Sequence, residues 1–524
     1  MMKLDAFDPL ESIVVTADQM GKIESRLFEA GMPVAALMEK AALLMSRRIQ
    51  ELYPLSNLSR VGILVGPGHN GGDALVIARE LHLQGYNVCL YRPFIQSKEL
   101  TNQHLKYAQS LGIPYSQEIE FLDNCELIID GLFGFGLTRE ISGHIDQAIE
   151  FINHLNIPII SVDIPSGLNT DTGKILGIAI KATYTLCLGL WKPVFFQDQA
   201  LEYLGKVERI NFGIPPKDVW AIVSKPAPLQ ILTPTLAQRF LPLPRPLVTH
   251  KYQQGHLLLI CGSRRYAGGS ILTGLGARSS GVGMLSIAVP ESLKPLLVSH
   301  LPDALIIDCP ETDNGAIAEL PPLAADFNNY DIIACGPGLT QEVTSVVEKV
   351  LKANCPVILD ADALNILAKL GTMDSLSQRK ATTILTPHLG EFKRLFPNIF
   401  DPGCDRIAAV RTAAQDTGAI ILLKGARTAI ATPNGSVWLI SDSTPALARG
   451  GSGDVLTGLI GGLLAQKTAS GGKIQTGVDV GGIVATAAWW HAQAGILAAK
   501  ERTELGVDAF TLSQWLVKVG TLPK

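Results

Sequence analysis

The 524-residue sequence lacks the features that mark membrane, secreted and nucleic-acid-binding proteins. It has no run of about 18 apolar residues able to span a membrane, and its start, MMKLDAFDPLESIVV, lacks the basic-then-apolar order of a secretory signal. The net charge of −4 gives no basic surface for nucleic acid. The eight cysteines form no CxxC pair, which argues against a zinc site or a disulfide framework and for reduced thiols. We therefore expect a cytoplasmic protein that binds neither membranes nor nucleic acids.

What the sequence does contain is enough apolar material for more than one core. Hydrophobic residues make up 47% of the chain, which excludes a disordered protein. Single hydrophobic cores stop growing near roughly 250–300 residues. A chain of 524 residues is therefore expected to hold at least two domains.

Apolar strand-like segments alternate with helical segments in the first half of the chain. Helical patterns are found at 73–84 and 142–155, and a longer helical region at roughly 18–52 precedes the first strand. Such alternation is typical of a parallel sheet that helices cover on both faces. We therefore predict an α/β domain with a Rossmann-like doubly wound sheet at residues 1–224. Its strand-like segments are 61–66, 87–91, 126–131 and 157–163.

The alternation stops at residues 225–246, which read KPAPLQILTPTLAQRFLPLPRP. Proline removes a backbone donor and restricts the residue before it. Residues 225–249 are therefore predicted to be a proline-rich linker without secondary structure, followed by a second α/β domain at residues 250–524. The strand-like segments of this second domain are 255–262, 284–290, 331–338, 355–360, 382–387 and 419–425.

The stretch RGGSGDVLTG (449–458) has the glycines of a phosphate-binding loop but no lysine. Glycines allow backbone N–H groups to face a ligand, and the start of a helix also favours an anion. The acidic residue of the stretch, Asp454, has two explanations. Either Ser452 caps the helix and Asp454 complements its dipole, or Asp454 accepts a proton from a hydroxyl that attacks a phosphoryl group.

Five further motifs follow one another in the second half. They are GSRRYAGGSILTGLGARSSGVGMLSIAVP (262–290), GPGL (336–339), VILDADALN (357–365), TPHLGEF (386–392) and KGART (424–428). With the glycine-rich stretch, they make residues 250–524 resemble the ADP/ATP-dependent NAD(P)H-hydrate dehydratases. The resemblance implies a ribokinase-like α/β/α sandwich.

The same resemblance implies a nucleotide site next to a hydrate site. Asp454 would be the catalytic base and would contact the hydrate together with Gly338 and His388. From residue type alone, Asp360 is also explained as a strand-end residue and Asp362 as a helix cap. ADP or ATP, with Mg²⁺, would bind at Lys424, Gly425, Ala426, Arg427, Thr428 and Gly453.

Glycine-containing loops also follow three predicted strands in the first half, although the usual GxGxxG fingerprint is absent. These loops lie in GPGHNGGDALVIAREL (66–81), DGLFGFG (130–136) and VDIPSGL (162–168). Because such loops converge at one edge of a parallel sheet, Asn70, Asp130 and Ser166 could hold a cation there. Asp163 would then face a substrate. Residue type does not identify the cation, since oxygen ligands also suit magnesium and calcium.

With TADQMGKIESRLFEAGMPVAALMEKAA (16–42) and GKVERINFGIP (205–215), these loops make residues 10–220 resemble the NAD(P)H-hydrate epimerases. The resemblance implies K⁺ at Asn70, Asp130 and Ser166, and a catalytic Asp163. Two residues depart from the family pattern, because Ala74 replaces a glycine and Asn169 replaces an aspartate. The hydrate would contact Asp163 and the residues Asn70, Gly71, Gly72, Asp73, Ala74, Gly134, Phe135, Gly136, Leu137, Thr138, Arg139 and Glu140.

Together the two resemblances imply an isomerase and a lyase that repair hydrated nicotinamide cofactors. The first domain would interconvert the R and S forms of NADHX and NADPHX, and the second would dehydrate the S form at the expense of ADP or ATP. Two alternatives stay open. The second domain could be a vitamin-precursor kinase fused to a nucleotide-binding domain, and the first could be a binding module without catalysis. We also expect a homo-oligomer.

Overall fold

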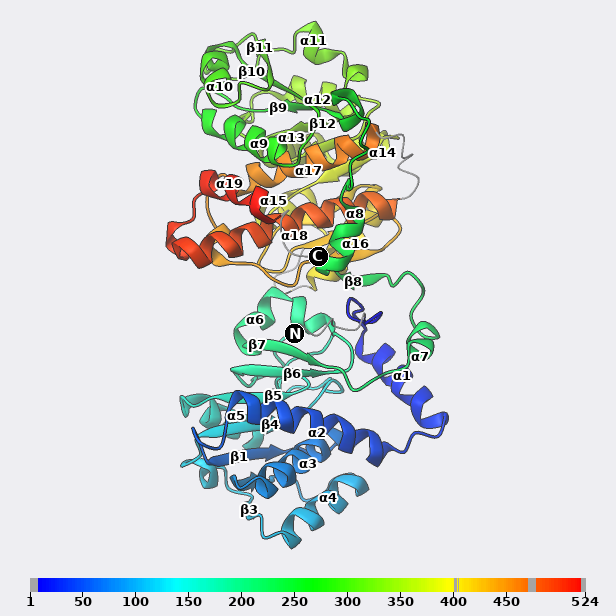
Figure 1. Cartoon of the computed structure of the whole chain (residues 1–524), viewed down its shortest axis with the longest axis vertical. Coiled ribbons are helices and arrows are strands. Elements are labelled where there is room, and N and C mark those ends of the chain that lie inside the picture. Colours follow the sequence, from blue (N-terminus) through cyan, green and yellow to red (C-terminus); the bar gives the residue numbers. More distant parts are fainter. Residues whose placement is uncertain (1–7, 400–402, 404, 470–476, 520–524) are drawn as a thin grey trace. The chain divides into compact units, whose positions relative to one another are not determined.

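The computed structural model describes residues 8–399, 403, 405–469 and 477–519. The chain divides into two compact units, Met1–Pro228 and Leu229–Lys524 (Figure 1). Each unit is built on its own sheet with helices around it, so the predicted α/β class with two domains is confirmed. Among the residues described, no helix combines the length and the apolar content that crossing a bilayer demands.

The described residues of the N-terminal unit form a seven-stranded parallel sheet in the order β3-β2-β1-β4-β5-β6-β7. Along β1, Val61, Ile63 and Val65 belong to one buried cluster and Leu64 to another, so the sheet is covered on both faces. The strand order reverses between β1 and β4, which confirms the doubly wound, Rossmann-like topology. The strands are β1 (Arg60–Val65), β2 (Asn87–Tyr91), β3 (Tyr115–Ser116), β4 (Leu127–Gly131), β5 (Ile159–Val162), β6 (Tyr184–Leu188) and β7 (Lys206–Ile210).

The helical region predicted at 18–52 is two helices, α1 and α2, because the chain turns between them. Gly31 has a φ of +98°, a conformation that favours glycine, and Pro33 precedes the first residue of α2. Thr16 and Gln19 form a capping box that fixes the start of α1. The helices of this unit are α1 (Ala17–Glu29), α2 (Val34–Leu52), α3 (His69–Leu83), α4 (Glu99–Ser110), α5 (His144–His154), α6 (Leu201–Leu204) and α7 (Pro216–Trp220).

The described residues of the C-terminal unit form a ten-stranded sheet in the order β11-β10-β9-β12-β13-β14-β15-β16-β17-β8. The strands from β11 to β15 are parallel, and β16 pairs antiparallel with both β15 and β17. They are β8 (Leu229–Ile231), β9 (His256–Ile260), β10 (Met284–Pro290), β11 (Leu305–Cys309), β12 (Ile332–Cys335), β13 (Val357–Leu359), β14 (Thr383–Leu385), β15 (Ile420–Leu423), β16 (Ala429–Ala431) and β17 (Val437–Leu439).

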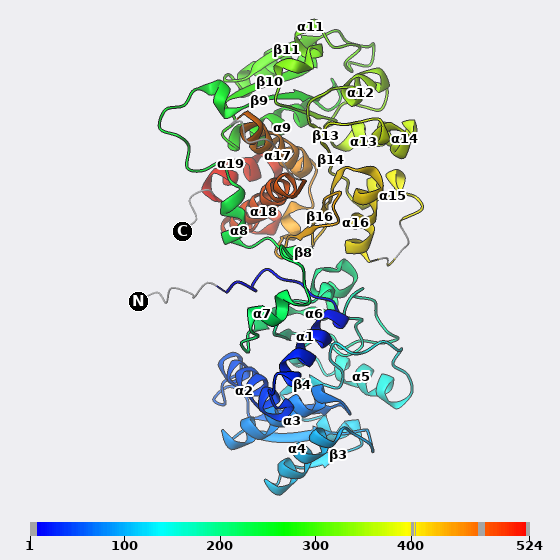
Figure 2. The ribbon, with the colours of Figure 1, turned by 90° about the vertical axis from the view of Figure 1, so that its right-hand side faces the viewer.

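Helices lie on both sides of this sheet, as expected for the α/β/α sandwich. Figure 2 shows α17, α18 and α19 on one side and α13, α15 and α16 on the other. The helices are α8 (Pro234–Phe240), α9 (Ala267–Ser279), α10 (Lys294–His300), α11 (Pro322–Ala325), α12 (Thr344–Leu351), α13 (Ala361–Leu370), α14 (Thr372–Ser377), α15 (Leu389–Leu395), α16 (Arg406–Thr417), α17 (Ser452–Ala469), α18 (Gly477–Arg502) and α19 (Ala509–Val519).

The prediction that residues 225–249 hold no secondary structure is wrong. Leu229 and Ile231 pair in register with Val437 and Leu439, so β8 adds an edge strand to the C-terminal sheet. The prolines flank this strand or, like Pro234, begin a helix, where a missing N–H costs nothing. The boundary between the two units along the chain therefore lies between Pro228 and Leu229, and β8 and α8 belong to the C-terminal unit.

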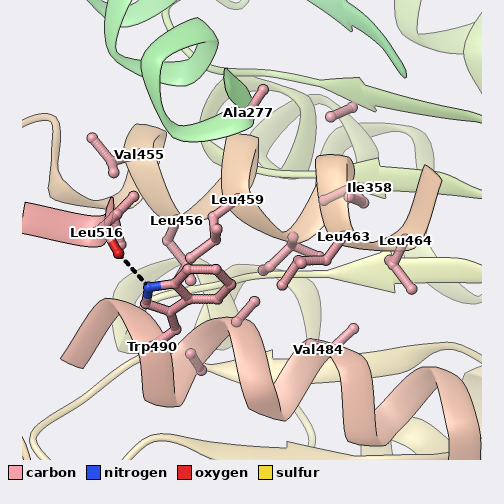
Figure 3. Packing of buried hydrophobic residues seen from close by; sticks show 14 of the residues in the cluster. Ala277, Ile358, Val455, Leu456, Leu459, Leu463, Leu464, Val484, Trp490 and Leu516 are labelled. Atoms are coloured by element: carbon pink, nitrogen blue, oxygen red, sulfur yellow. Dashed lines mark hydrogen bonds between the residues drawn. The ribbon is translucent and has the colours of Figure 1, made fainter. Parts of the chain in front are cut away.

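Close packing of α17 on α9 forms the centre of the C-terminal core. A Cβ at Gly458 would collide with the carbonyl oxygen of Thr273, so the two helices approach closely only because position 458 is glycine. Figure 3 shows Leu456, Leu459 and Leu463 of α17 pointing toward α18, where the Trp490 Nε1 donates to the Leu516 carbonyl at 2.6 Å. This packing fixes the N-terminal end of α17, which carries Asp454.

Candidate active sites

A cavity of about 780 Å³ opens in the N-terminal unit. Its walls come from α1, α2, the start of α3 and the loops that follow β4, β5 and β6. Of the predicted substrate contacts, the structure brings Asn70, Asp73, Gly134, Phe135, Gly136, Leu137, Thr138, Arg139 and Asp163 to its surface. Gly71, Gly72 and Ala74 are buried in α3 behind it, and the exposed Glu140 is outside the lining.

Asp163 lies at the carboxyl end of β5, where its backbone takes a φ of +67°. Its Oδ1 accepts hydrogen bonds from the Lys192 Nζ at 2.6 Å and the Leu188 N–H at 3.1 Å. Its Oδ2 has no hydrogen-bond partner among the described residues. One oxygen is therefore fixed by the protein while the other is available in the cavity.

Lys192 was not singled out from the sequence, although it has a recognisable signal. It is a lone cation in the apolar segment LGLWKPVFF, and its side chain is only 1% exposed. Burial lowers the pKa of Lys192, but the nearby Asp163, together with Cys187 and Glu24, raises it by more. The lysine therefore stays charged beside Asp163.

Two further carboxyl groups line the same cavity. Burial raises the pKa of Glu24 on α1 to about 7; the nearby Lys192 and Lys98 lower it, and Asp163 raises it. Burial raises the pKa of Asp73 well above its usual value, and the charges of Asp163 and Glu24 add to that effect. The cavity can therefore hold carboxyl groups in different protonation states near neutral pH.

The predicted cation ligands gather around the loop after β4. Asp130 is fully buried and accepts hydrogen bonds from Ser161 and Ser166 hydroxyls and from the N–H groups of Leu132 and Ser166. A Cβ at Gly134 would lie 3.0 Å from the Asn70 Oδ1, which places Asn70 against the same loop. The structure therefore brings Asn70, Asp130 and Ser166 into one region.

The two departures from the epimerase pattern have different consequences. Ala74 points its methyl group at Gly131, away from the cavity wall, so the larger residue takes up no space in the cavity. Asn169 closes a turn, since its Oδ1 accepts hydrogen bonds from the N–H groups of Asp171 and Thr172. An aspartate could accept the same bonds, so this replacement preserves the turn.

In the C-terminal unit, Asp454 is the third residue of α17 and lies beside the first turn of α9 and the glycine loop that follows β12. A Cβ at Gly269 would be 3.3 Å from the Asp454 Oδ2 and 3.7 Å from the Gly338 N–H nitrogen, so the structure brings Asp454 and Gly338 together. Burial raises the pKa of Asp454 to about 7; the nearby Asp360 adds to this and Lys424 opposes it. A carboxyl group with that pKa is suited to accept a proton at neutral pH.

Lys424 connects the predicted nucleotide loop to the start of α17. Its Nζ donates to the Asp360 Oδ1 at 2.8 Å, while the Thr457 hydroxyl donates to the Asp360 Oδ2 at 2.7 Å. A Cβ at Gly453 would lie 3.4 Å from the Lys424 Nζ. Asp360 therefore does more than end a strand, because it holds the lysine against the glycine-rich turn.

Neither helix-cap explanation agrees with the structure. Asp362 lies in the first turn of α13, but its Oδ2 accepts from the Thr340 N–H at 2.9 Å and so fixes the neighbouring loop. Ser452 is the first residue of α17, and its hydroxyl lies 3.2 Å from the His491 Nε2. A helix cap would use its side-chain oxygen to accept from the first N–H groups of its own helix. In both cases that oxygen instead contacts a group from a distant segment.

His388 is the residue that caps a helix. Its Nδ1 accepts from the Gly390 and Glu391 N–H groups at 3.0 and 3.3 Å, and its own N–H donates to the Glu391 Oε2. The imidazole is 57% exposed, and Glu391 lies 4.0 Å from the Lys424 Nζ. His388 is therefore anchored next to the lysine, with its ring open to a ligand.

The remaining predicted nucleotide contacts, Gly425, Ala426, Arg427 and Thr428, form the loop between β15 and β16. Arg406, which the sequence did not indicate, supports this loop from α16. Its guanidinium donates to the carbonyl oxygens of Arg427 at 2.7 Å and Lys424 at 3.2 Å. The loop is therefore held by a buried cation behind it.

Comparison with known protein families gives one match in each of the two units that hold the candidate sites. Residues 34–194 match the family described as YjeF-related protein N-terminus, and residues 257–518 match the NAD(P)H-hydrate dehydratase family. The bifunctional NAD(P)H-hydrate repair enzyme of Synechocystis sp. is 56% identical over 504 residues, or 96% of this chain and 94% of that one. This chain belongs to the bifunctional NAD(P)H-hydrate repair enzymes.

Other bifunctional NAD(P)H-hydrate repair enzymes are similar over the same length. The protein from Thermosynechococcus vestitus is 49% identical over 95% of each chain. Among solved structures, the ADP/ATP-dependent NAD(P)H-hydrate dehydratase from Bacillus subtilis, co-crystallized with ATP/Mg²⁺, is 33% identical with a TM-score of 0.44. It matches 54% of this chain and 95% of its own.

Proposed function

We propose that the N-terminal unit interconverts the R and S hydrates of NADH and NADPH. The C-terminal unit then returns the S hydrate to the reduced cofactor at the expense of ADP or ATP. The observation that carries this proposal is that each unit places one carboxyl group, Asp163 or Asp454, close to the charge of a lysine and to glycine-containing loops. Self-association of the chain stays a prediction.

In the N-terminal unit, the reaction takes place at C6 of the hydrated ring, which bears both the hydroxyl and the ring nitrogen. The nitrogen lone pair helps the protonated hydroxyl to leave as water, and a water that adds to the other face inverts the centre. Asp163 can take up the proton that this water loses, because its Oδ2 is available in the cavity. The cavity of about 780 Å³ is within the size range of small-molecule sites.

In the C-terminal unit, the hydroxyl must be made a better leaving group. Asp454 accepts its proton while the oxygen attacks the terminal phosphoryl group of the nucleotide. Lys424 and the N–H groups at the start of α17 supply positive charge at the phosphates. The phosphate then leaves C6, and loss of a proton from C5 restores the ring double bond.

The residues Asn70, Asp130 and Ser166 fit a bound K⁺. Burial raises the pKa of Asp130 more than its hydrogen bonds lower it, and among the described residues no cation pairs with it. The Asn70 Oδ1, the amide atom that can bind a cation, accepts no hydrogen bond among the described residues, and the buried Nδ2 has no acceptor that would fix the amide in another orientation. A monovalent cation would balance the buried charge with oxygen ligands alone.

Mg²⁺ fits the C-terminal site as a companion of the nucleotide. In the part of the chain that the structure describes, no three His, Cys, Asp or Glu side chains are grouped to hold a metal. Mg²⁺ that arrives on the polyphosphate neutralises part of its charge. The chain itself contributes Lys424 and the loop that Arg406 supports.

The proposal is tested with an equal mixture of R and S hydrates, with and without ADP or ATP. Full recovery of reduced cofactor requires both activities, whereas recovery of half shows the dehydratase alone, after the slow spontaneous epimerisation is subtracted. A stable phosphorylated product would indicate a vitamin-precursor kinase in place of a dehydratase. Asp163→Ala that leaves epimerisation intact would indicate that the N-terminal unit only binds its ligand.

A further inference from the structure

We propose that Glu24 is the second acid–base residue of the N-terminal site and serves the ring face opposite Asp163. The inference rests on the proposed epimerisation and concerns how it is carried out. Inversion at C6 requires a proton to be delivered on the face that water leaves and removed on the face that water enters. Two groups on different sides of the ring can do this, and Asp163 is one of them.

The fold holds Glu24 at the cavity without giving it a structural partner. Its neighbours Ile23 and Leu27 are buried in the core, and Arg26 pairs with Asp218 at 3.4 Å, so α1 is fixed on both sides of Glu24. Among the described residues, the Glu24 carboxyl makes no hydrogen bond and no ion pair. A carboxyl group that is on a cavity wall and makes no polar contact with the protein is available to a ligand in that cavity.

Glu24 and Asp163 reach the cavity from separate elements. Glu24 comes from α1, whereas Asp163 follows β5, and the two carboxyl groups are not hydrogen-bonded to each other. Asp163 is paired with Lys192, while burial raises the pKa of Glu24 to about 7. The cavity therefore offers a lysine-paired carboxyl group from β5 and, from α1, a carboxyl group that is partly protonated near neutral pH, which is the combination that one direction of the reaction needs.

The complete step conserves atoms and charge. The protonated Glu24 delivers its proton to the C6 hydroxyl, the C–O bond breaks, and water leaves while the nitrogen lone pair forms a C6=N1 double bond. A second water adds to C6 from the other face, its proton passes to Asp163, and the nitrogen regains its lone pair. The enzyme is then left with the opposite protonation states, which suit the reverse reaction, and exchange with solvent restores the first state.

Asp73 is the alternative second group, because it also lines the cavity as an unpaired carboxyl. It lies within the first two turns of α3, in the loop-and-helix segment 70–74 that is predicted to hold the hydrate. Glu24 lies outside both predicted binding loops. We therefore assign proton transfer to Glu24 and substrate contact to Asp73.

The test follows both inversion and oxygen exchange in the full-length chain, without nucleotide. Each purified hydrate is incubated in ¹⁸O-labelled water, and chromatography with mass spectrometry gives the R/S ratio and the label at C6. Glu24→Gln is expected to lower inversion at least about 100-fold. In this variant, the hydrate whose hydroxyl faces Asp163 is expected still to exchange its oxygen with water and to keep its configuration. In Asp163→Asn, the other hydrate is expected to exchange its oxygen and keep its configuration.

A matched control is Glu29→Gln, which removes an exposed carboxyl from the same helix. It is expected to match the parent in both measurements, and thermal unfolding of the N-terminal unit at the parental temperature reports that Glu24→Gln is folded. Three outcomes would overturn the assignment. Glu24→Gln could invert the hydrates at the parental rate, it could lose oxygen exchange equally from both hydrates, or Asp73→Asn could show the pattern expected of Glu24→Gln. A parent chain that does not interconvert the hydrates contradicts the proposed function itself, whereas interconversion without label contradicts only the two-face mechanism.

Discussion

At the scale of single residues, ion pairs with lysines decide which carboxyl group of each site can gain or lose a proton near neutral pH. Asp163 is paired with Lys192, and Asp360 is paired with Lys424 beside Asp454. Each lysine compensates one buried acid, so the remaining acid of the C-terminal site, Asp454, is free to change its protonation state. In the proposed mechanism, the chemistry of both units depends on this division between a paired and an unpaired carboxyl group.

Asp454 gives dehydration a defined pH dependence. Burial raises its pKa to about 7, and the base must be ionised to accept a proton, so kcat/KM is expected to fall about tenfold per pH unit below that value. Asp454→Asn is expected to lower dehydration at least about 100-fold and to leave epimerisation unchanged. The measurement is the rate of NADH formation from the S hydrate with ADP or ATP.

The control for Asp454 is Asp416→Asn, which removes an exposed carboxyl from α16 in the same unit. It is expected to keep the parental rate and pH profile. Dehydration by Asp454→Asn at the parental rate would show that another group removes the proton.

Asp130 predicts a dependence of the N-terminal unit on K⁺. Replacing K⁺ with tetramethylammonium leaves the buried charge of Asp130 without a counterion, so epimerisation is expected to slow and the unit to unfold at a lower temperature. A ligand present at 100 times its Kd stabilises the folded state by about 2.7 kcal/mol. Calorimetry and the epimerisation rate in the two salts check this, and identical results in both would exclude a K⁺ site. Dehydration in the same salts serves as the control.

The residues that could be predicted from the sequence are those that follow a strand within one motif. Asp163 ends a strand just before a glycine-containing loop and Asp454 follows glycines at a helix start, so local spacing reveals them. Lys192 and Glu24 could not be found this way, because Lys192 pairs with Asp163, 29 residues earlier in the chain, and Glu24 makes no polar contact among the described residues. A cavity that is lined by segments distant from one another in the sequence exists only after folding.

At the scale of elements, the contact between α9 and α17 leaves no room for a larger residue at position 458. Gly458→Ala places a methyl group against the Thr273 carbonyl oxygen, and overpacking of this kind costs about 1–3 kcal/mol. This exceeds the gain of roughly 1 kcal/mol in helix propensity. Urea unfolding of the C-terminal unit is expected to show a net loss of stability.

Gly268→Ala in α9 is the matched control for this prediction. Nothing lies within 4 Å of a Cβ at position 268, so only the helix propensity changes and the unit is expected to gain stability. If Gly458→Ala also stabilised the protein, the close contact between the two helices would not be rigid.

Element boundaries show what local sequence patterns leave out. The apolar segments at 61–66 and 284–290 were predicted well, because strands buried on both faces are apolar throughout. The short strand β8 was missed because three residues among prolines carry no pattern of their own. Its pairing with β17, more than 200 residues further along the chain, decides its conformation.

At the scale of the whole molecule, the boundary at Pro228 and Leu229 predicts how the chain can be divided. A fragment of residues 229–524 is expected to be more stable than one of residues 250–524, which loses β8, α8 and the contact between Phe240 and Trp438 at 5.5 Å. Burying one Leu or Phe side chain contributes about 1.5–3 kcal/mol. Thermal unfolding of the two fragments checks this. Equal melting temperatures would show that residues 229–249 do not stabilise the C-terminal unit, as expected of a linker.

Every described residue that lines the N-terminal cavity comes before Pro228, and Asp454 and its neighbours all come after it. Damage to one centre therefore leaves the other complete. Molecules disabled at Asp163 and molecules disabled at Asp454 would complement each other when mixed, because an S hydrate released by one kind can diffuse to the other. Two defective alleles in one cell would then maintain the pool of reduced cofactor that neither could maintain alone.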